Sequence, residues 1–226
     1  MKNSKNFILF TLSFFLGILN FYGQSIISDK LSYEQIEKKI DSLQNEKDKA
    51  LVLIDYYIEK SKKENNEESL FYAYRYASKY YQKLNNFKYA DSALIIAKKS
   101  KSTQLLTAAY LNKGTIYMDE GFYQKALDNI LFANKYSIEL KDDYITNKTV
   151  YFIAQNKIYL GNYEDANKEL KLCIDYFKNN LNDKSSLGEN SQLFYIYSLI
   201  SYLDTNTKIG KQNENKLLIE EIKVIA

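Results

Sequence analysis

A six-residue pattern, G-x-Y-x-x-A, occurs twice in this chain of 226 residues. It reads GFYQKA at residues 121–126 and GNYEDA at residues 161–166, although the sequences around the two copies differ. The same order of small and large residues continues downstream, with Ile130 and Ala133 after one copy and Leu170 and Cys173 after the other. Spacings of three and four residues put such side chains on one stripe of a helix.

The residues upstream of the pattern repeat as well. A degenerate third copy has Asn85 at the turn, and all three copies carry a small residue seven positions before the turn: Ser78, Gly114 and Ala154. Two antiparallel helices approach closely where side chains are small, and Gly or Asn at the turn accepts the left-handed conformation that ends a helix. The pattern therefore predicts helical hairpins, which must stack because none can bury its apolar face alone.

Composition agrees with a helical chain. Proline, the strongest helix breaker, is absent, and the 22 tyrosines suit half-buried helix faces. Ser32 and Gln35 form a capping-box pattern that predicts a helix start, and Leu51, Ile54 and Ile58 mark a second helix. We predict an all-α fold.

These features resemble the tetratricopeptide repeat (TPR) family. The best copy, 107–140, matches the family pattern at Tyr110, Gly114, Tyr117, Gly121, Tyr123, Ala126, Ile130 and Ala133. The copies at 71–104 and 147–180 match less fully, with Asn85 in place of glycine and Lys157 in place of tyrosine. The resemblance implies a right-handed α-α superhelix of about five hairpins over residues 24–226. It also implies repeat-packing roles for Gly114, Tyr117, Gly121, Tyr123, Ala126, Gly161, Tyr163 and Ala166.

In TPR proteins the first helices of successive repeats line a concave groove that binds a peptide or protein segment. The matching positions in this chain are Tyr72, Arg75, Tyr76, Lys79, Asn112, Lys148, Tyr151 and Gln155. Some family members clamp a terminal carboxylate there, but Lys79 stands where asparagine is usual. The hypothesis is a basic, tyrosine-rich groove for an acidic or aromatic segment. The alternative is that these are solvated helix residues, with tyrosines packed between hairpins.

Several function classes are disfavoured by what the chain lacks. The sequence has no histidine, the commonest general base, and its one cysteine, Cys173, falls at a small-residue packing position that predicts a buried, inert thiol. No glycine-rich phosphate loop or metal-ligand spacing is present, so we predict a non-catalytic protein without cofactor or metal. A net charge of +3 and a single arginine, Arg75, argue against direct nucleic-acid binding.

The N-terminus predicts export. Lys2 and Lys5 precede an apolar run from Phe7 to Phe21, as in a secretory signal peptide, and we place cleavage after Gly23. The predicted domains are thus a signal peptide at 1–23 and a repeat domain at 24–226, in a periplasmic or secreted protein. The alternative is an uncleaved segment that anchors the chain to a membrane. The lysine- and asparagine-rich composition is typical of an AT-rich bacterial genome.

The C-terminal helix expected over 213–225 leaves little polar surface, which predicts self-association or a further partner. The chain also looks like the extracytoplasmic arms of AraC-like membrane-bound bacterial regulators, without their transmembrane and helix-turn-helix parts. We therefore predict an exported protein- or peptide-binding scaffold. The alternative is the sensory arm of a truncated transcriptional regulator. The partner is not identified by the sequence.

Overall fold

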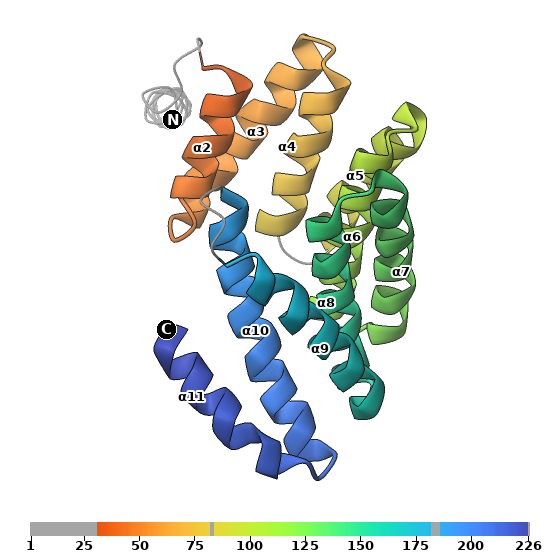
Figure 1. Ribbon diagram of the computed structural model, residues 1–226. Coiled ribbons are helices and arrows are strands. Elements are labelled where there is room, and N and C mark those ends of the chain that lie inside the picture. Colours follow the sequence, from red (N-terminus) through yellow and green to blue (C-terminus); the bar gives the residue numbers. More distant parts are fainter. Residues whose placement is uncertain (1–30, 82–83, 182–185, 226) are drawn as a thin grey trace, which may run out of the picture. The chain divides into compact units, whose positions relative to one another are not determined.

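The computed structural model describes residues 31–81, 84–181 and 186–225. The predicted signal peptide at 1–23 lies outside these residues. The chain divides into two compact units, residues 1–89 and 90–226, which are described separately. Every regular element in the described ranges is a helix (Figure 1). They are α2 (Tyr33–Ser42), α3 (Lys47–Lys63), α4 (Glu67–Tyr80), α5 (Leu84–Ser100), α6 (Thr103–Asp119), α7 (Tyr123–Leu140), α8 (Asp143–Tyr159), α9 (Tyr163–Asn179), α10 (Ser186–Lys208), the short 3-10 helix η1 (Gln212–Glu214) and α11 (Asn215–Ile225).

Helices pack on their neighbours in sequence, as in a helical solenoid. The ten α-helices form five consecutive hairpins, so the predictions of an all-α fold and of about five hairpins are confirmed. The second, third and fourth hairpins each begin four residues before the copies predicted at 71–104, 107–140 and 147–180, because a capping residue starts each helix earlier than the repeated apolar pattern.

The first helix of each of these three hairpins begins behind a side-chain cap. The side-chain oxygens of Asn66, Ser102 and Asp142 accept hydrogen bonds from backbone N–H groups three residues later, at 2.9, 3.3 and 2.9 Å. These bonds satisfy donors that a helix start leaves unpaired. The predicted capping box at Ser32 and Gln35 is also present at the start of α2.

The turn inside each hairpin depends on glycine in the second unit. Gly121 and Gly161 have φ values of 78° and 80°, in the left-handed region. In both turns the next residue donates its backbone N–H, at 2.8 Å, to a carbonyl five residues earlier. The prediction that Asn85 occupies such a turn is wrong, because α5 begins at Leu84 and Asn85 lies in its first turn.

Small side chains let the paired helices approach. Ala126, Ala154 and Ala166 are fully buried, and Gly114 is buried against Ile130. Larger predicted packing residues lie around them. The rings of Tyr123 and Tyr159 are stacked 4.7 Å apart, and Tyr117 makes an edge contact with Phe122.

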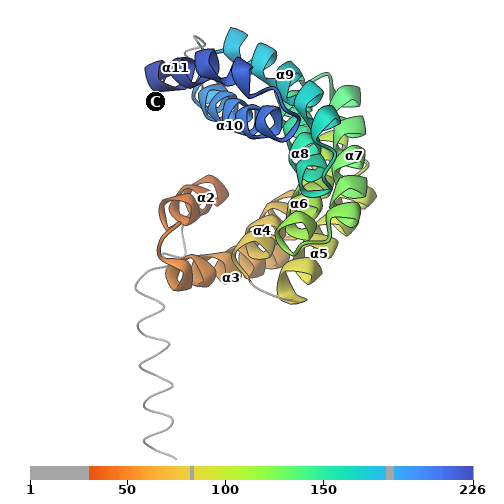
Figure 2. The ribbon, with the colours of Figure 1, turned by 90° about the horizontal axis from the view of Figure 1, so that it is seen from below.

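The core of the first unit joins α2, α3 and α4. Its fully buried residues include Ile36, Ile40, Ile54 and Tyr57. In the second unit, the last core cluster joins α9 and α10 through Phe177, Phe194, Tyr195 and Leu199. Helix α11 lies beside α10, as Figure 2 shows, and contributes Leu218 and Ile222 to that cluster.

Candidate functional site

A pocket of about 360 Å³ lies in the first unit, where the α2–α3 turn meets the end of α4. Its lining residues are Gln44, Asn45, Lys47, Lys79 and Tyr80. One of them, Lys79, is among the predicted groove residues. Tyr80 is buried and donates its phenol to the carbonyl of Ile40 at 3.3 Å, which fixes one wall of the pocket.

The pocket is positively charged. Lys47 and Lys79 are both exposed, and neither forms an ion pair with any described residue. Of the two acids adjacent to Lys47 in the sequence, Glu46 pairs with Lys49. None of the described lining residues carries a carboxylate, and Gln44 and Asn45 add amide donors. Helix α3 begins at this pocket without a side-chain cap, so its dipole adds partial positive charge.

Beside the pocket, the predicted groove face of α4 contacts α2 in part. Tyr76 donates its phenol to the carboxylate of Asp41, with distances of 3.1 and 3.2 Å to the two oxygens. Burial, then the negative charge of Asp41, raises the pKa of Tyr76. Tyr72 is half-buried, and burial raises its pKa too.

Arg75 does not offer its charge as Lys79 does. Its guanidinium carbon lies 5.8 Å from the ring centre of Phe71 and 6.0 Å from that of Tyr72. Its Nε is buried and has no hydrogen-bond partner among the described residues. Burial lowers the pKa of Arg75, because removal from water disfavours the charged form.

The remaining predicted groove residues lie in the second unit, on α6 and α8. Asn112 is half-buried on α6. On α8, Lys148 lies 5.3 Å from the ring centre of Phe194, and Gln155 donates to the hydroxyl of Ser201 at 2.7 Å. These α8 side chains are therefore engaged by α10.

Tyr151 belongs to the same α8–α10 contact. Its ring lies 5.4 Å from that of Phe194 and 6.4 Å from that of Tyr197. Burial raises the pKa of Tyr151 to about 12. The three α8 residues thus fit the alternative of tyrosines packed between hairpins. Lys79, by contrast, is exposed, and its ammonium lies 5.9 Å from the ring centre of Tyr80 without an ion pair to a described residue.

Sequence reasoning did not find Gln44, Asn45 and Lys47. They lie in and just after the turn of the first hairpin, which matches the repeat pattern only in its helical period. A weak sequence signal existed, since the polar run QNEKDK, which contains two amides and two lysines, follows the first predicted helix.

The described ranges contain neither a cluster of metal ligands nor a membrane-spanning helix. No three His, Cys, Asp or Glu side chains are grouped there to hold a metal ion. No helix there has the length and apolar character needed to cross a bilayer. Cys173 is fully buried, as predicted, and burial raises the pKa of its thiol to about 12.

The hairpins, their left-handed glycine turns and their small-residue contacts define a TPR-like repeat fold. Two solved structures of kinesin light chain nearly identical TPR-like repeats from Podosopora anserina are similar to it, with TM-scores of 0.59 and 0.58. Each is 15% identical in sequence and covers 85% of this chain and 92% of its own. No protein-family model and no curated protein matches the chain.

A TPR-like repeat fold is consistent with a non-catalytic protein-interaction scaffold. The similarity to the arms of AraC-like regulators stays a prediction, since neither neighbour addresses it.

Proposed function

We propose that this protein is an exported scaffold that recognises an acidic segment of a partner protein through the pocket between Lys47 and Lys79. The observation that carries the proposal is that two lysines from separate helices, neither paired with a described acid, line one pocket whose described lining residues include no acid. A carboxylate entering it would meet both ammonium groups and the amides of Gln44 and Asn45. Charge-assisted hydrogen bonds of this kind are among the stronger ones in proteins.

Aromatic character beside the pocket favours an extended peptide over a small anion. Tyr72 and Tyr76 lie on the same helix as Lys79, two turns and one turn before it, and both keep part of their surface exposed. Side chains flanking the acid of the partner would lie over these rings. The pocket therefore selects for an acidic residue, and the α4 face for apolar or aromatic neighbours.

Selection of peptides from a displayed library, followed by affinity measurement, tests the proposal. We expect selected peptides to share an acidic residue, and their affinity to fall with added salt. Lys79→Glu and Lys47→Glu should each weaken binding by about tenfold or more, which corresponds to about 1.4 kcal/mol. Lys79→Arg should retain most of the binding.

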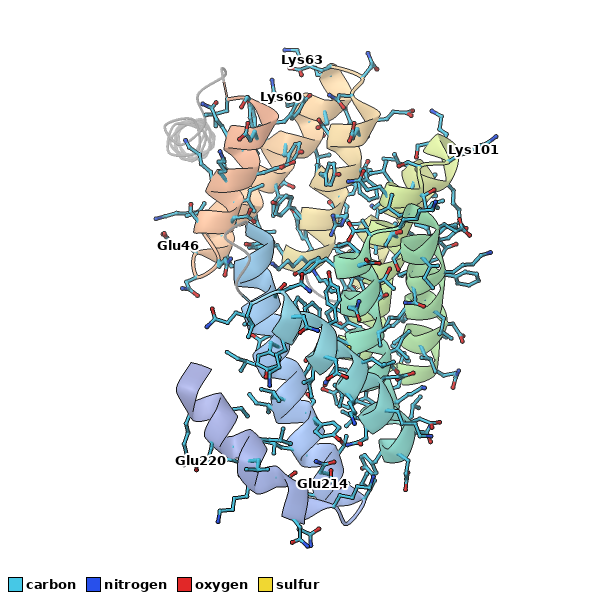
Figure 3. The ribbon with its side chains drawn as sticks, in the orientation of Figure 1. Glu46, Lys60, Lys63, Lys101, Glu214 and Glu220 are labelled. Carbon is cyan, nitrogen blue, oxygen red and sulfur yellow. The ribbon has the colours of Figure 1, made fainter. Side chains whose placement is uncertain are left out.

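Lys63→Glu is the matched control. It makes the same charge change on α3, but Figure 3 shows Lys63 at the opposite end of that helix from Glu46, which precedes the pocket. Equal affinity of the wild type and Lys79→Glu for the selected peptides would overturn the proposed site, provided that both proteins melt alike.

Export is the second part of the proposal, and it is supported by the basic and apolar sequence pattern of residues 1–23. N-terminal sequencing of the protein recovered outside the cytoplasm should begin at Gln24. A chain that is recovered only in the cytoplasm and still begins at Met1 would contradict export.

A further inference from the structure

The last hairpin repeats the geometry of the one before it, which allows α10 to be aligned with α8. Gly210 has a φ of 78°, and the following residue, Lys211, donates its N–H to the carbonyl of Asn206 at 2.7 Å. The same arrangement occurs at Gly161. Gly161 therefore corresponds to Gly210, a shift of 49 residues. This shift pairs Tyr144 with Leu193, Lys148 with Tyr197, and Tyr151 with Ile200.

In α8, the face that carries these residues is covered by the next first helix, α10. Tyr144 makes an edge contact with Phe194 at 6.3 Å, and Lys148 and Tyr151 lie against the same ring. Each of the three α8 residues is half-buried as a result. This face is the one on which successive hairpins stack.

In α10, the corresponding face is uncovered. Leu193, Tyr197 and Ile200 are 45%, 43% and 52% exposed. The second helix of the hairpin is also less covered than its counterpart. Ile219 in α11 is 43% exposed, whereas the corresponding Leu170 in α9 is fully buried. Within the second unit, the described helices that pack on α10 are α8, α9, η1 and α11. Of the stripe, Tyr197 contacts Tyr151 of α8 along one edge, at 6.4 Å between ring centres, and still keeps 43% of its surface exposed.

We propose that this uncovered stripe is a self-association surface, on which α10 of a second copy of this chain docks in antiparallel orientation about a two-fold axis. Leu193, Tyr197 and Ile200 follow one another at spacings of four and three, so they form one ridge that can interdigitate with its own copy. A two-fold interface needs such a self-complementary patch. The proposal is independent of the peptide pocket, which lies in the other unit.

Charge favours the antiparallel orientation. Lys148 lies beside Phe194 at one end of the stripe, and Asp204 is exposed one turn beyond Ile200 at the other end. Antiparallel docking brings the Asp204 end of each copy to the Lys148 end of its partner. Parallel docking would instead place the two Asp204 carboxylates side by side, where they repel.

The surface of α2, the first described helix, argues against stacking of the α10 stripe of one copy on α2 of another. The exposed residues of α2 are polar or charged: Glu34, Gln35, Lys38, Lys39, Asp41 and Ser42. An apolar stripe gains little by packing on such a surface, because charged groups would lose their hydration. The stripe on α10 is best matched by another copy of itself. The self-association surface that the sequence predicted at 213–225 is thereby moved mainly to α10, with Ile219 of α11 at its edge.

Sedimentation equilibrium of the purified chain over a range of concentrations tests the proposal. We expect a monomer–dimer equilibrium, and Ile200→Glu should weaken the dimer by at least about tenfold. The matched control is Leu172→Glu, since Leu172 is a 60% exposed leucine on α9 that lies outside the stripe. It should leave the equilibrium unchanged.

Crosslinking distinguishes the orientation. In an antiparallel dimer centred between Tyr197 and Ile200, Ile200→Cys should form a disulfide between copies on oxidation. Asp204→Cys should not, because the two copies of residue 204 would lie about 16 Å apart along the axis. A chain that stays monomeric throughout the concentration range, or a dimer that is insensitive to Ile200→Glu, would overturn the proposal. Efficient crosslinking through Asp204→Cys would overturn the antiparallel orientation. Peptide binding at Lys79 should be unaffected by Ile200→Glu.

Discussion

A Cβ atom at Gly114 would lie 2.5 Å from Cγ1 of Ile130 and 3.3 Å from the carbonyl oxygen of Ala126. The side chain of Ile130 on α7 therefore contacts the backbone of α6, at the one position of α6 that has no side chain. Ile130 is fully buried and cannot move aside easily.

Gly114→Ala should consequently destabilise the protein, although alanine is the better helix former. Overpacking costs about 1–3 kcal/mol, and helix propensity returns about 1 kcal/mol. A net loss of up to about 2 kcal/mol should appear in urea unfolding. The penalty should shrink in an Ile130→Ala background, which removes the clashing atom. A Gly114→Ala protein more stable than the wild type would contradict the close contact.

Lys141 ends α7 in the left-handed conformation, with a φ of 59°. That conformation costs a non-glycine residue about 1 kcal/mol or more. Lys141→Gly should therefore raise the free energy of unfolding by up to about 1 kcal/mol, after the entropy cost of glycine. Lys135→Gly, an exposed change inside the same helix, should lower it by a similar amount. Thermal melts of the two variants should shift in opposite directions.

Asn156 is fully buried on α8, and neither its amide nitrogen nor its carbonyl oxygen has a hydrogen-bond partner in the described structure. The corresponding residue of the preceding hairpin, 40 positions earlier, is Ile116. Asn156→Leu should stabilise the protein by about 1–3 kcal/mol, because a buried group that cannot pair carries its full desolvation cost. Equal or lower stability in chemical denaturation would mean that the amide is satisfied, for example by a bound water.

The buried tyrosines of the first unit make its stability sensitive to alkali. Tyr57 donates its phenol to Glu37 at 2.5 Å, and burial, then this bond and the charge of Glu37, raise the pKa of Tyr57. The pKa of Tyr76 is raised for similar reasons, by burial and by the charge of Asp41. In the unfolded chain a tyrosine ionises near pH 10. Above that pH the unfolded chain loses protons that the folded chain keeps, so stability should fall as the pH rises.

Urea midpoints measured between about pH 8 and pH 11 should show this decline, and tyrosinate absorbance should rise with unfolding. In Tyr57→Phe the decline should be shallower, because one shifted group is removed. The variant should also be less stable at neutral pH, since Glu37 loses its hydrogen bond. A flat profile for the wild type would show that these phenols ionise freely in the folded state.

Cys173 should be inert in the folded protein. With a pKa of about 12 and no exposed surface, its thiol is almost wholly protonated at neutral pH. A thiol reagent should label it only after denaturation. The introduced Ile200→Cys, on the exposed stripe, is the reactive control. Rapid labelling of Cys173 in the native protein would show that α9 opens readily.

The G-x-Y-x-x-A pattern predicted the hairpins of the second unit because it marks the two places where helix pairs depend on specific small residues. Gly121 and Gly161 permit the turn, and Ala126 and Ala166 permit the close approach. The prediction of a turn at Asn85 was wrong because an asparagine at the position of the turn glycine can lie in a helix as well as in a turn. The alignment could not show that α5 begins one residue earlier.

The G-x-Y-x-x-A pattern did not predict the last hairpin, for a different reason. Its Gly210 forms the same turn, but η1 follows it, and α11 starts only at Asn215. Asn215 stands five residues after the turn glycine, where the other copies have alanine. Its amide donates to the carbonyl of Leu203 at 3.1 Å and accepts from Asn206 at 3.0 Å. At this position hydrogen bonds replace the close contact of a small residue. A search for regularly spaced apolar residues does not detect them.

The candidate pocket could not be predicted from the sequence either, because it depends on tertiary structure. Lys79 was identified from its position in a repeat, but Arg75 and Tyr76 were assigned the same role on the same evidence. Which side chain stays free is decided by α2, whose Asp41 binds Tyr76. Lys47 and Lys79 are far apart in sequence, and only the fold of the first unit brings them to one pocket.

Because the described helices pack mostly on helices next to them in sequence, most of their contacts close short loops. Chains with such local contacts fold quickly, and their hairpins can form before the whole chain is complete. The same arrangement favours evolutionary growth by duplication, since a new hairpin copied from α8 and α9 would find a matching surface on the hairpin before it. The widening distance between turn glycines, from 40 to 49 residues, is consistent with copies that have since diverged by insertion.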